Sequence, residues 1–341
     1  MNHSTFKSFT FGIGLFFTLP LVYGNSSSPS SSDGTLYINK SKTHKVAPVK
    51  YGFHYEEIGM MGEGALHAEL IRNRSFEEAT PPAGLSVKNG LYENVPAPRV
   101  KEKKVFQADP LIGWTTYPLS YTPVFISRTD ENPMSGENKY SMLVNVTEDI
   151  ANHPDALILN RGYYGMNLKT DTSYRLSLFL KNRNYSAPLR VFLVDEWGQR
   201  VSNVIEVNVG NRDWTKYTGE LKPEKNVRRG MFAIQPMSKG QFQIDVVSLF
   251  PSDTWNDGKS VFRKDIVQNL KEFSPSFIRF PGGCIVHGVN EETMYHWKKT
   301  LGPIENRPGQ WSKWAPYYRT DGIGYHEFYE LCEYVGDRKS T

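Results

Sequence analysis

The sequence predicts an α/β fold with an all-β insertion: a partial (β/α)8 barrel of about two βα units, interrupted by an antiparallel, jelly-roll-like β-sandwich. Two observations predict this fold. Apolar residues alternate with polar ones through the middle of the chain, and apolar residues recur at helical spacing after residue 255. Alternation indicates half-buried strands, while short strands followed by helices are typical of a parallel barrel.

The first 24 residues have the features of a signal peptide. Lys7 supplies a positive charge, residues 9–22 are apolar, and small or β-branched residues precede position 25. The apolar stretch is short for a membrane span, and Pro20 interrupts its end. We therefore expect a secreted or periplasmic protein without an integral membrane span after signal removal. Residues 25–34 form a Ser-rich linker.

Residues 35–80 are interpreted as the start of the barrel. Residues 50–58 form a short aromatic-rich strand candidate that ends in Glu56 and Glu57. Adjacent strand residues point to opposite faces, so at most one of these acids can face a site. The alternative interpretation is a solvated, acidic strand end.

Residues 105–251 carry the pattern of the sandwich. Tyr174, Leu176, Leu178 and Leu180 are predicted to share one face of a strand. A later strand is predicted to place Phe242, Ile244, Val246 and Phe250 on one face. The absence of helical spacing between these strands favours an antiparallel sandwich.

Residues 255–341 return to the barrel pattern. A helix is expected through Phe262, Ile266, Leu270 and Phe273, and a short buried strand over residues 277–280. After Pro281-Gly282-Gly283, a long loop runs to about Gly324. A second helix then follows, with Gly336 as its C-cap and with an apolar stripe of Phe328, Leu331, Cys332 and Val335.

Strand ends identify a candidate site. In a (β/α) barrel the loops after the strands form the active-site face, so Glu56 and the segment from Pro281 to Cys284 are expected on that face. The glycine pair has two interpretations that the residues alone leave open. It is either a tight turn that needs positive φ, or backbone that approaches a ligand closely.

Charge and cysteine content exclude several classes. The net charge is +4, with basic residues dispersed apart from clusters at Lys101–Lys104 and Arg228–Arg229, so a nucleic-acid partner is not expected. Cys284 and Cys332 are the only cysteines, and two free thiols are favoured over a disulfide. The spacing of ligand residues indicates no metal site, and no cofactor is expected.

Four ordered blocks carry a family resemblance: YGFHYEEIG with GEGALHAELIRNRSFE, FIRFPGGC, YHWKKTLGPIENRPGQW, and TDGIGYHEFYELCE. Together they resemble the glycoside hydrolase family 51 α-L-arabinofuranosidases. Between them, GWTTY, NRGYYGMNLKTDTSYRLSLFLK and FQIDVVSLFP resemble a family 4/9 type carbohydrate-binding sandwich.

The resemblance implies a retaining hydrolase that removes terminal non-reducing α-L-arabinofuranosyl residues from arabinan or arabinoxylan, with arabinose-containing glycans as partners. Glu56 matches the family's acid that binds a substrate hydroxyl. Cys284 occupies a position that lines the sugar subsite. Trp297, Trp311 and Trp314 lie in the segment that supplies aromatic walls.

One departure from the family is large. Retaining hydrolysis needs two carboxyl groups about 5–5.5 Å apart. In the family these are glutamates after the fourth and seventh barrel strands, and no matching motif occurs here, so no catalytic residue is assigned. We expect the barrel portion at 255–341 to be truncated and the chain to be inactive by itself.

The alternative function is that of a secreted carbohydrate-binding protein that acts through its sandwich. Trp114, Tyr163, Tyr164 and Trp197 are candidate glycan contacts, with core packing as the competing interpretation for each. A third interpretation is that a separate chain completes the barrel.

Overall fold

A computed structural model describes Ser41 and residues 51–80, 86–89, 91–93, 106–288, 291–311 and 317–336. The expected signal peptide, the Ser-rich linker and Trp314 lie outside these residues. Within the described part of the chain, no helix has both the length and the apolar character needed to cross a membrane.

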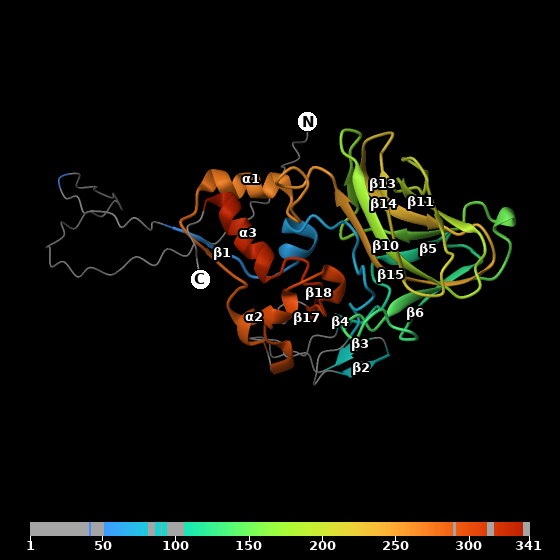
Figure 1. Cartoon of the computed structure of the whole chain (residues 1–341), viewed down its shortest axis with the longest axis horizontal. Helices are drawn as coiled ribbons and strands as arrows, with labels where there is room; N and C mark the ends of the chain where they lie inside the picture. Colours follow the sequence, from blue (N-terminus) through green and yellow to red (C-terminus); the bar gives the residue numbers. More distant parts are fainter. Residues whose placement is uncertain are drawn as a thin grey trace, which may run out of the picture. The chain divides into compact units, whose positions relative to one another are not determined.

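Two antiparallel sheets dominate the fold (green to yellow-orange in Figure 1). The five-stranded sheet has the order β13-β10-β15-β7-β6, and the six-stranded sheet has the order β12-β11-β14-β8-β5, with β9 paired to β14. Their strands are β5 (Trp114–Tyr117), β6 (Val124–Thr129), β7 (Ser141–Val146), β8 (Leu157–Asn160), β9 (Met166–Leu168), β10 (Tyr174–Asn182), β11 (Pro188–Val194), β12 (Ile205–Asn208), β13 (Thr215–Leu221), β14 (Val227–Gln235) and β15 (Gly240–Pro251).

The predicted alternation along β10 is confirmed. Tyr174, Leu176, Leu178 and Leu180 are all buried in one hydrophobic cluster. Residues of the six-stranded sheet, such as Leu193, belong to the same cluster, so the two sheets share a core. This is the arrangement that alternating sequences produce when each sheet buries one face.

A β-bulge changes the pattern along β15. The expectation that Phe242, Ile244, Val246 and Phe250 share one face is wrong for its second half. The pairing with β10 shifts register between Ser177 and Phe179, and Val246 adopts a positive φ of 41°. An extra residue in one strand reverses which side chains point inward. Val247 and Leu249 therefore enter the shared core in place of Val246 and Phe250.

The remaining residues contain one short parallel strand pair. β1 (Phe53–His54) pairs in parallel with β16 (Ile278–Arg279). Helix α1 (Lys264–Phe273) precedes β16 and ends at Ser274, which is left-handed with φ 49°. Helix α3 (Tyr325–Val335) ends at Gly336 with φ 82°, which confirms the expected C-cap.

A second hydrophobic cluster covers this strand pair. Phe328, Leu331, Cys332 and Val335 of α3 are buried there, as predicted. From α1, Val267 is the fully buried side chain, and the expected stripe residue Phe273 is instead 57% exposed. The buried face of α1 is thus displaced from the predicted stripe, because Val267 was not part of that stripe and Phe262 is buried but precedes the helix. Ile266 and Leu270 pack partly buried against the same cluster.

The sequence predicts a long loop over residues 284–324, where the structure contains several short elements. They are α2 (Cys284–His287), the 3₁₀ turns η3 (Glu291–Thr293), η4 (Trp297–Thr300) and η5 (Ile304–Asn306), and the antiparallel pair β17 (Gln310–Trp311) and β18 (Tyr318–Arg319). Earlier in the chain lie the π-helical turn η1 (Gly62–Leu66) and a small antiparallel sheet of β2 (Ser86–Lys88), β3 (Leu91–Glu93) and β4 (Phe106–Gln107). A further 3₁₀ turn, η2 (Ile150–Asn152), lies within the sandwich.

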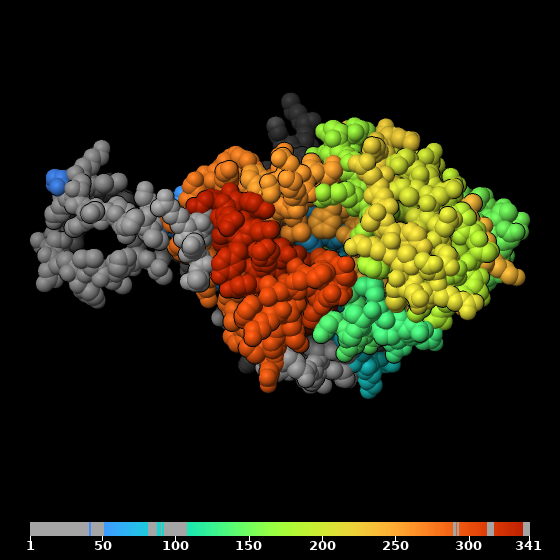
Figure 2. Space-filling model, viewed as in Figure 1, coloured from blue at the N-terminus to red at the C-terminus, as the bar shows by residue number. Residues whose placement is uncertain are grey.

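The chain enters and leaves the sandwich along two adjacent segments. Backbone hydrogen bonds join Leu70 N–H to Leu249 O at 3.0 Å, Val247 N–H to Arg74 O at 2.9 Å, and Ala68 N–H to Val261 O at 2.8 Å. In Figure 2 the blue atoms of the early segment lie recessed between the orange segment and the green strands. The two segments that connect the sandwich to the rest of the chain are thus hydrogen-bonded to each other.

Candidate functional site

The candidate site lies where β1 and β16 end. Because the two strands are parallel, the residues that follow them lie at the same edge. Glu56 follows β1, and its Oε1 accepts a hydrogen bond from Ile285 N–H at 3.1 Å. Ile285 lies in the first turn of α2, so the two strand ends are joined by this contact across 229 residues of chain.

Gly282 lies directly against the side chain of Glu56. Its φ is +144°, and a Cβ built there would lie 2.4 Å from Glu56 Cγ. A side chain at position 282 would therefore displace the glutamate. At Gly283 the equivalent Cβ would lie 3.5 Å from Glu56 Oε2, which is an ordinary contact distance. Of the two interpretations of this glycine pair, the turn that needs positive φ holds at Gly282, where the backbone packs against the Glu56 side chain. Close approach of this backbone to a ligand stays a prediction.

Glu57 points into a different environment, as opposite faces of a strand require. Its Oε2 accepts hydrogen bonds from Tyr55 Oη–H at 2.7 Å and Gly62 N–H at 2.8 Å, and its Oε1 accepts from Tyr317 Oη–H at 2.8 Å. Burial raises the pKa of Glu57, and the nearby Glu63 carboxylate raises it further. Glu57 is a buried, fully hydrogen-bonded side chain and not a free acid.

Sequence reasoning did not find a buried polar network beside Glu57. Glu63 Oε1 accepts from Thr320 N–H and Oγ1–H, both at 2.9 Å, and Glu63 Oε2 accepts from Tyr163 Oη–H at 3.1 Å. Arg319 and Asp321 form a buried ion pair at 3.1 Å. Burial raises the pKa of Asp321, and Arg319 lowers it in part. In the sequence, the polar residues Arg319, Thr320 and Asp321 between two apolar segments were the feature that could have indicated this network.

Two of the predicted aromatic wall residues, Trp297 and Trp311, differ in their exposure to solvent. Trp297 in η4 is 44% exposed, and its ring centroid lies 5.0 Å from that of Tyr325. Tyr325 in turn contacts Phe280, directly after β16, at 5.9 Å. Trp297 is thus linked by ring contacts to the loop that carries Gly282. Trp311 is only 6% exposed and offers no open ring face, because β17 turns it inward.

Cys284 begins α2 and is half-buried, whereas Cys332 is buried in the cluster beneath α3. The two cysteines form no disulfide with each other. Cys284 is one residue from Ile285, whose N–H binds Glu56. The structure therefore brings together three of the predicted elements of the site: Glu56, Cys284 and, through ring contacts, Trp297.

Some of the candidate aromatic residues of the sandwich are buried and others are exposed to solvent. Trp114 is buried, and its Nε1–H donates to Asn73 O at 3.0 Å. The Tyr163 hydroxyl is used by Glu63. Tyr164 and Trp197 remain open to solvent, at 77% and 73% exposure.

The chemistry available at the strand ends is recognition of a polar ligand. A carboxylate held by a backbone N–H keeps acceptor capacity for hydroxyl groups, and an exposed indole offers a flat apolar face. No group of three or more His, Cys, Asp or Glu residues suited to a metal ion occurs among the described residues. A polyol such as a sugar fits this combination of groups.

Comparisons with known proteins agree with this chemistry. Residues 269–339 match the family described as the alpha-L-arabinofuranosidase 1 domain. Alpha-L-arabinofuranosidase 1 from Arabidopsis thaliana is 28% identical over 291 residues, which are 84% of this chain and 39% of that protein. An extracellular exo-alpha-L-arabinofuranosidase from Streptomyces chartreusis is 27% identical over 84% of this chain and 31% of its own length. The chain thus spans well under half of these relatives.

A solved structure gives the same result for the fold. The arabinose-bound MgGH51 α-L-arabinofuranosidase superposes with a TM-score of 0.71 and 25% sequence identity, over 88% of this chain and 44% of that one. On the family match, the relatives and this superposition, the chain is related to the glycoside hydrolase family 51 α-L-arabinofuranosidases.

Proposed function

We propose that this chain supplies the sugar-recognition part of an arabinofuranosidase-type glycoside hydrolase, which removes terminal non-reducing α-L-arabinofuranosyl residues from arabinan or arabinoxylan. The observation that carries the proposal is that Glu56 packs against Gly282 and accepts a hydrogen bond from Ile285 N–H, next to Cys284, at the ends of two parallel strands. Glu56 accepts hydrogen bonds from sugar hydroxyls, Cys284 lines the subsite, and Trp297 contributes an aromatic wall. Trp311 and Trp314 are proposed as further residues of the aromatic segment on the family resemblance alone.

The domain arrangement is part of the proposal. Residues 35–80 and 255–341 form about the first two βα units of a (β/α)8 barrel, and residues 105–251 form an inserted carbohydrate-binding-like sandwich. The parallel pair of β1 and β16, with α1 leading into β16, supports this arrangement. Residues 1–24 are proposed as a cleaved signal peptide and residues 25–34 as a linker, which makes the protein secreted or periplasmic.

We also propose that the 341-residue chain alone binds sugar but does not hydrolyse it. A retaining mechanism needs an acid/base and a nucleophile about 5–5.5 Å apart with free oxygens. Both oxygens of Glu57 and of Glu63 accept protein hydrogen bonds. Glu69 is occupied in the same way, by Ile71 N–H, Leu249 N–H and the Ser248 hydroxyl. These buried carboxylates support structure, which leaves neither role to them.

The test is a titration of the purified chain with L-arabinose and arabinobiose, followed by calorimetry, together with an assay on an aryl α-L-arabinofuranoside. Glu56→Gln is expected to weaken binding about tenfold or more, because a hydrogen bond to a charged group is worth about 1.5–3 kcal/mol. Glu206→Gln, an exposed position on β12, is the matched control and should bind normally. Equal binding by the two variants would contradict the role of Glu56. Turnover that Glu56→Gln abolishes would contradict the proposed lack of hydrolysis.

The alternative function, a secreted carbohydrate-binding protein that acts through its sandwich, has one supporting observation. A cavity of about 300 Å³ is lined by Tyr117, Arg190, Phe192 and Gln235, and Trp197 beside Gly198 of its rim is 73% exposed. Affinity electrophoresis of the chain in arabinoxylan and arabinan gels tests it. Trp197→Ala should restore free mobility if the sandwich face binds glycan, and unchanged mobility of the parent chain in both gels would refute it.

A further inference from the structure

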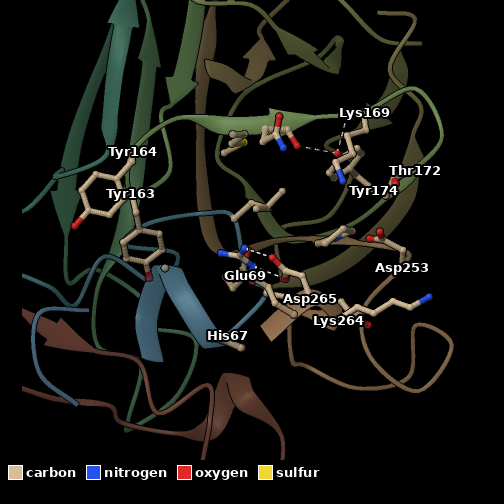
Figure 3. Close-up of a pocket in the computed structure, with 18 of the residues that line it drawn as sticks. His67, Glu69, Tyr163, Tyr164, Lys169, Thr172, Tyr174, Asp253, Lys264 and Asp265 are labelled. Carbon is tan, nitrogen blue, oxygen red and sulfur yellow. Dashed lines mark hydrogen bonds and ion pairs between the residues drawn. The ribbon is translucent and has the colours of Figure 1, made fainter. Parts of the chain in front are cut away.

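A larger cavity lies away from the strand ends, where the sandwich meets the rest of the chain. Its volume is about 570 Å³, within the range of sites that bind small ligands. Its lining comes from residues 64–70, residues 163–174, residues 251–254 and the start of α1. Figure 3 shows Tyr163 and Tyr164 on one side of it and Lys169, Tyr174 and Asp253 on the other. Neither Glu56 nor Cys284 contributes to this lining.

The lining combines flat apolar surfaces with unused charged groups. Tyr164 is 77% exposed, so its ring is available to a ligand. Within the described part of the chain, the side chains of Lys169, Asp253 and Lys264 take part in no hydrogen bond or ion pair. Two ammonium groups and a carboxylate therefore remain as donors and an acceptor. Arg263 and Asp265, also in the lining, already bind each other at 2.5 Å.

Two buried polar side chains in the lining make no hydrogen bond, although His67 Nδ1 lies 4.0 Å from Glu63 Oε2. Thr254 is 2% exposed and its Oγ1 makes no hydrogen bond, and neither ring nitrogen of His67, also 2% exposed, makes one. Such groups are rare, because a buried polar atom without a partner costs about 1–3 kcal/mol. By contrast, Glu69 in the same lining has all its contacts filled by protein groups.

The cavity continues along the edge of the sandwich. A second hollow of about 390 Å³ shares Asn167 and Lys169 with the first. It adds Asp171, Asn226 and Arg228 to the lining. A pair of hollows with shared walls suits an elongated ligand better than a single small molecule.

We propose that this junction is an accessory site for a segment of neutral polysaccharide, separate from the arabinose site at the strand ends. Sugar rings stack on tyrosine faces, and their hydroxyl groups both donate and accept, which matches the ammonium and carboxylate groups of the lining. Cationic and anionic groups occur together here, so the site does not select a charged polymer. The choice of an arabinose- or xylose-based polymer rests on the proposed function, while the existence of the site does not.

The experiment uses the full chain and two neutral probes, a linear α-1,5-arabino-oligosaccharide and a linear xylo-oligosaccharide, in calorimetric titrations. Tyr164→Ala and Asp253→Asn are each expected to weaken binding about fivefold or more, as truncation of a central contact does. Phe125→Ala is the matched control, because it removes a 55% exposed aromatic ring outside the cavity, and Trp197→Ala reports separately on the other sandwich face. Each variant's melting temperature is measured first, so that a folding defect is recognised.

The outcomes separate the two proposals. Oligosaccharide binding that survives Glu56→Gln and is lost in Tyr164→Ala supports the accessory site, even if the arabinose site fails its own test. Loss of binding only in Trp197→Ala, or only in Glu56→Gln, overturns the accessory site. The absence of binding of both probes to the parent chain also overturns it.

Discussion

Glu69 and Leu249 are 180 residues apart, yet the Glu69 carboxylate accepts a hydrogen bond from Leu249 N–H at 2.8 Å. The same carboxylate also accepts from Ile71 N–H at 2.9 Å and from the Ser248 hydroxyl at 2.6 Å. It thus fastens the segment that enters the sandwich to the strand that leaves it. Burial raises the pKa of Glu69, while the Arg74 charge and these hydrogen bonds lower it in part.

Glu69→Ala should lower the free energy of unfolding by about 2–4 kcal/mol, because three buried donors lose their acceptor. Glu69→Gln should cost less, since its amide oxygen can still accept from the backbone. Chemical denaturation followed by circular dichroism measures both. The exposed Glu206→Gln variant should stay within about 0.5 kcal/mol of the parent. Equal stability of Glu69→Ala and the parent would show that the carboxylate does not join the two segments.

Gly282→Ala should weaken arabinose binding about tenfold or more without unfolding the chain. The added Cβ would lie 2.4 Å from Glu56 Cγ, at a φ of +144° that side chains rarely adopt. The glutamate must therefore move away from Ile285 N–H. Calorimetric titration with arabinose measures the effect.

Gly283→Ala is the matched neighbour for this test. Its Cβ would lie 3.5 Å from Glu56 Oε2, an ordinary contact, and its φ is −98°. We expect binding within a factor of about two of the parent. If the two alanine variants bind arabinose equally, the placement of Glu56 by Gly282 is not what controls recognition.

Part of this site was predictable from residue patterns, and part was not. Strand β10 and helix α3 follow regular periods, so the buried faces at Leu178 and Leu331 could be read from spacing. Glu56 and Cys284 could be assigned to one edge because each follows a strand. These are features that neighbouring residues determine.

The missed features depend on tertiary contacts. The bulge at Val246 shifts the inward side chains of β15 without any glycine or proline to announce it. Glu63 meets Thr320 across 257 residues of chain, and no periodic pattern links them. Trp311 resembles an exposed aromatic in sequence, yet the β17–β18 pair turns it inward. Tertiary packing determines whether these side chains are buried, and the spacing of neighbouring residues does not predict that packing.

Glu78 should make stability depend on pH. Burial raises the pKa of Glu78 from 4.5 to about 7, although Arg72 at 3.3 Å opposes the shift. Between these values the folded chain holds a proton that the unfolded chain has lost, so the free energy of unfolding falls as pH rises from about 4.5 to about 7.

Glu78→Gln removes this titration. Between about pH 5 and about pH 8, the melting temperature of the parent should fall further than that of the variant. His67, whose pKa burial lowers well below its ordinary value, acts in the opposite direction in both proteins and therefore cancels in the comparison. Identical pH profiles for the two proteins would contradict the raised pKa.

The hydrogen bonds between the two segments that connect the sandwich to the rest of the chain have a consequence for the order of folding. Glu56 and Ile285 must meet across 229 residues of chain, and closing so long a loop costs entropy before any contact compensates for it. Once the sandwich has formed, the bonds from Leu70 to Leu249 and from Ala68 to Val261 already hold the two flanks together. The loop still to be closed then comprises only residues 56–68 and 261–285. These contacts predict that the sandwich forms first and that the candidate site at Glu56 assembles after it.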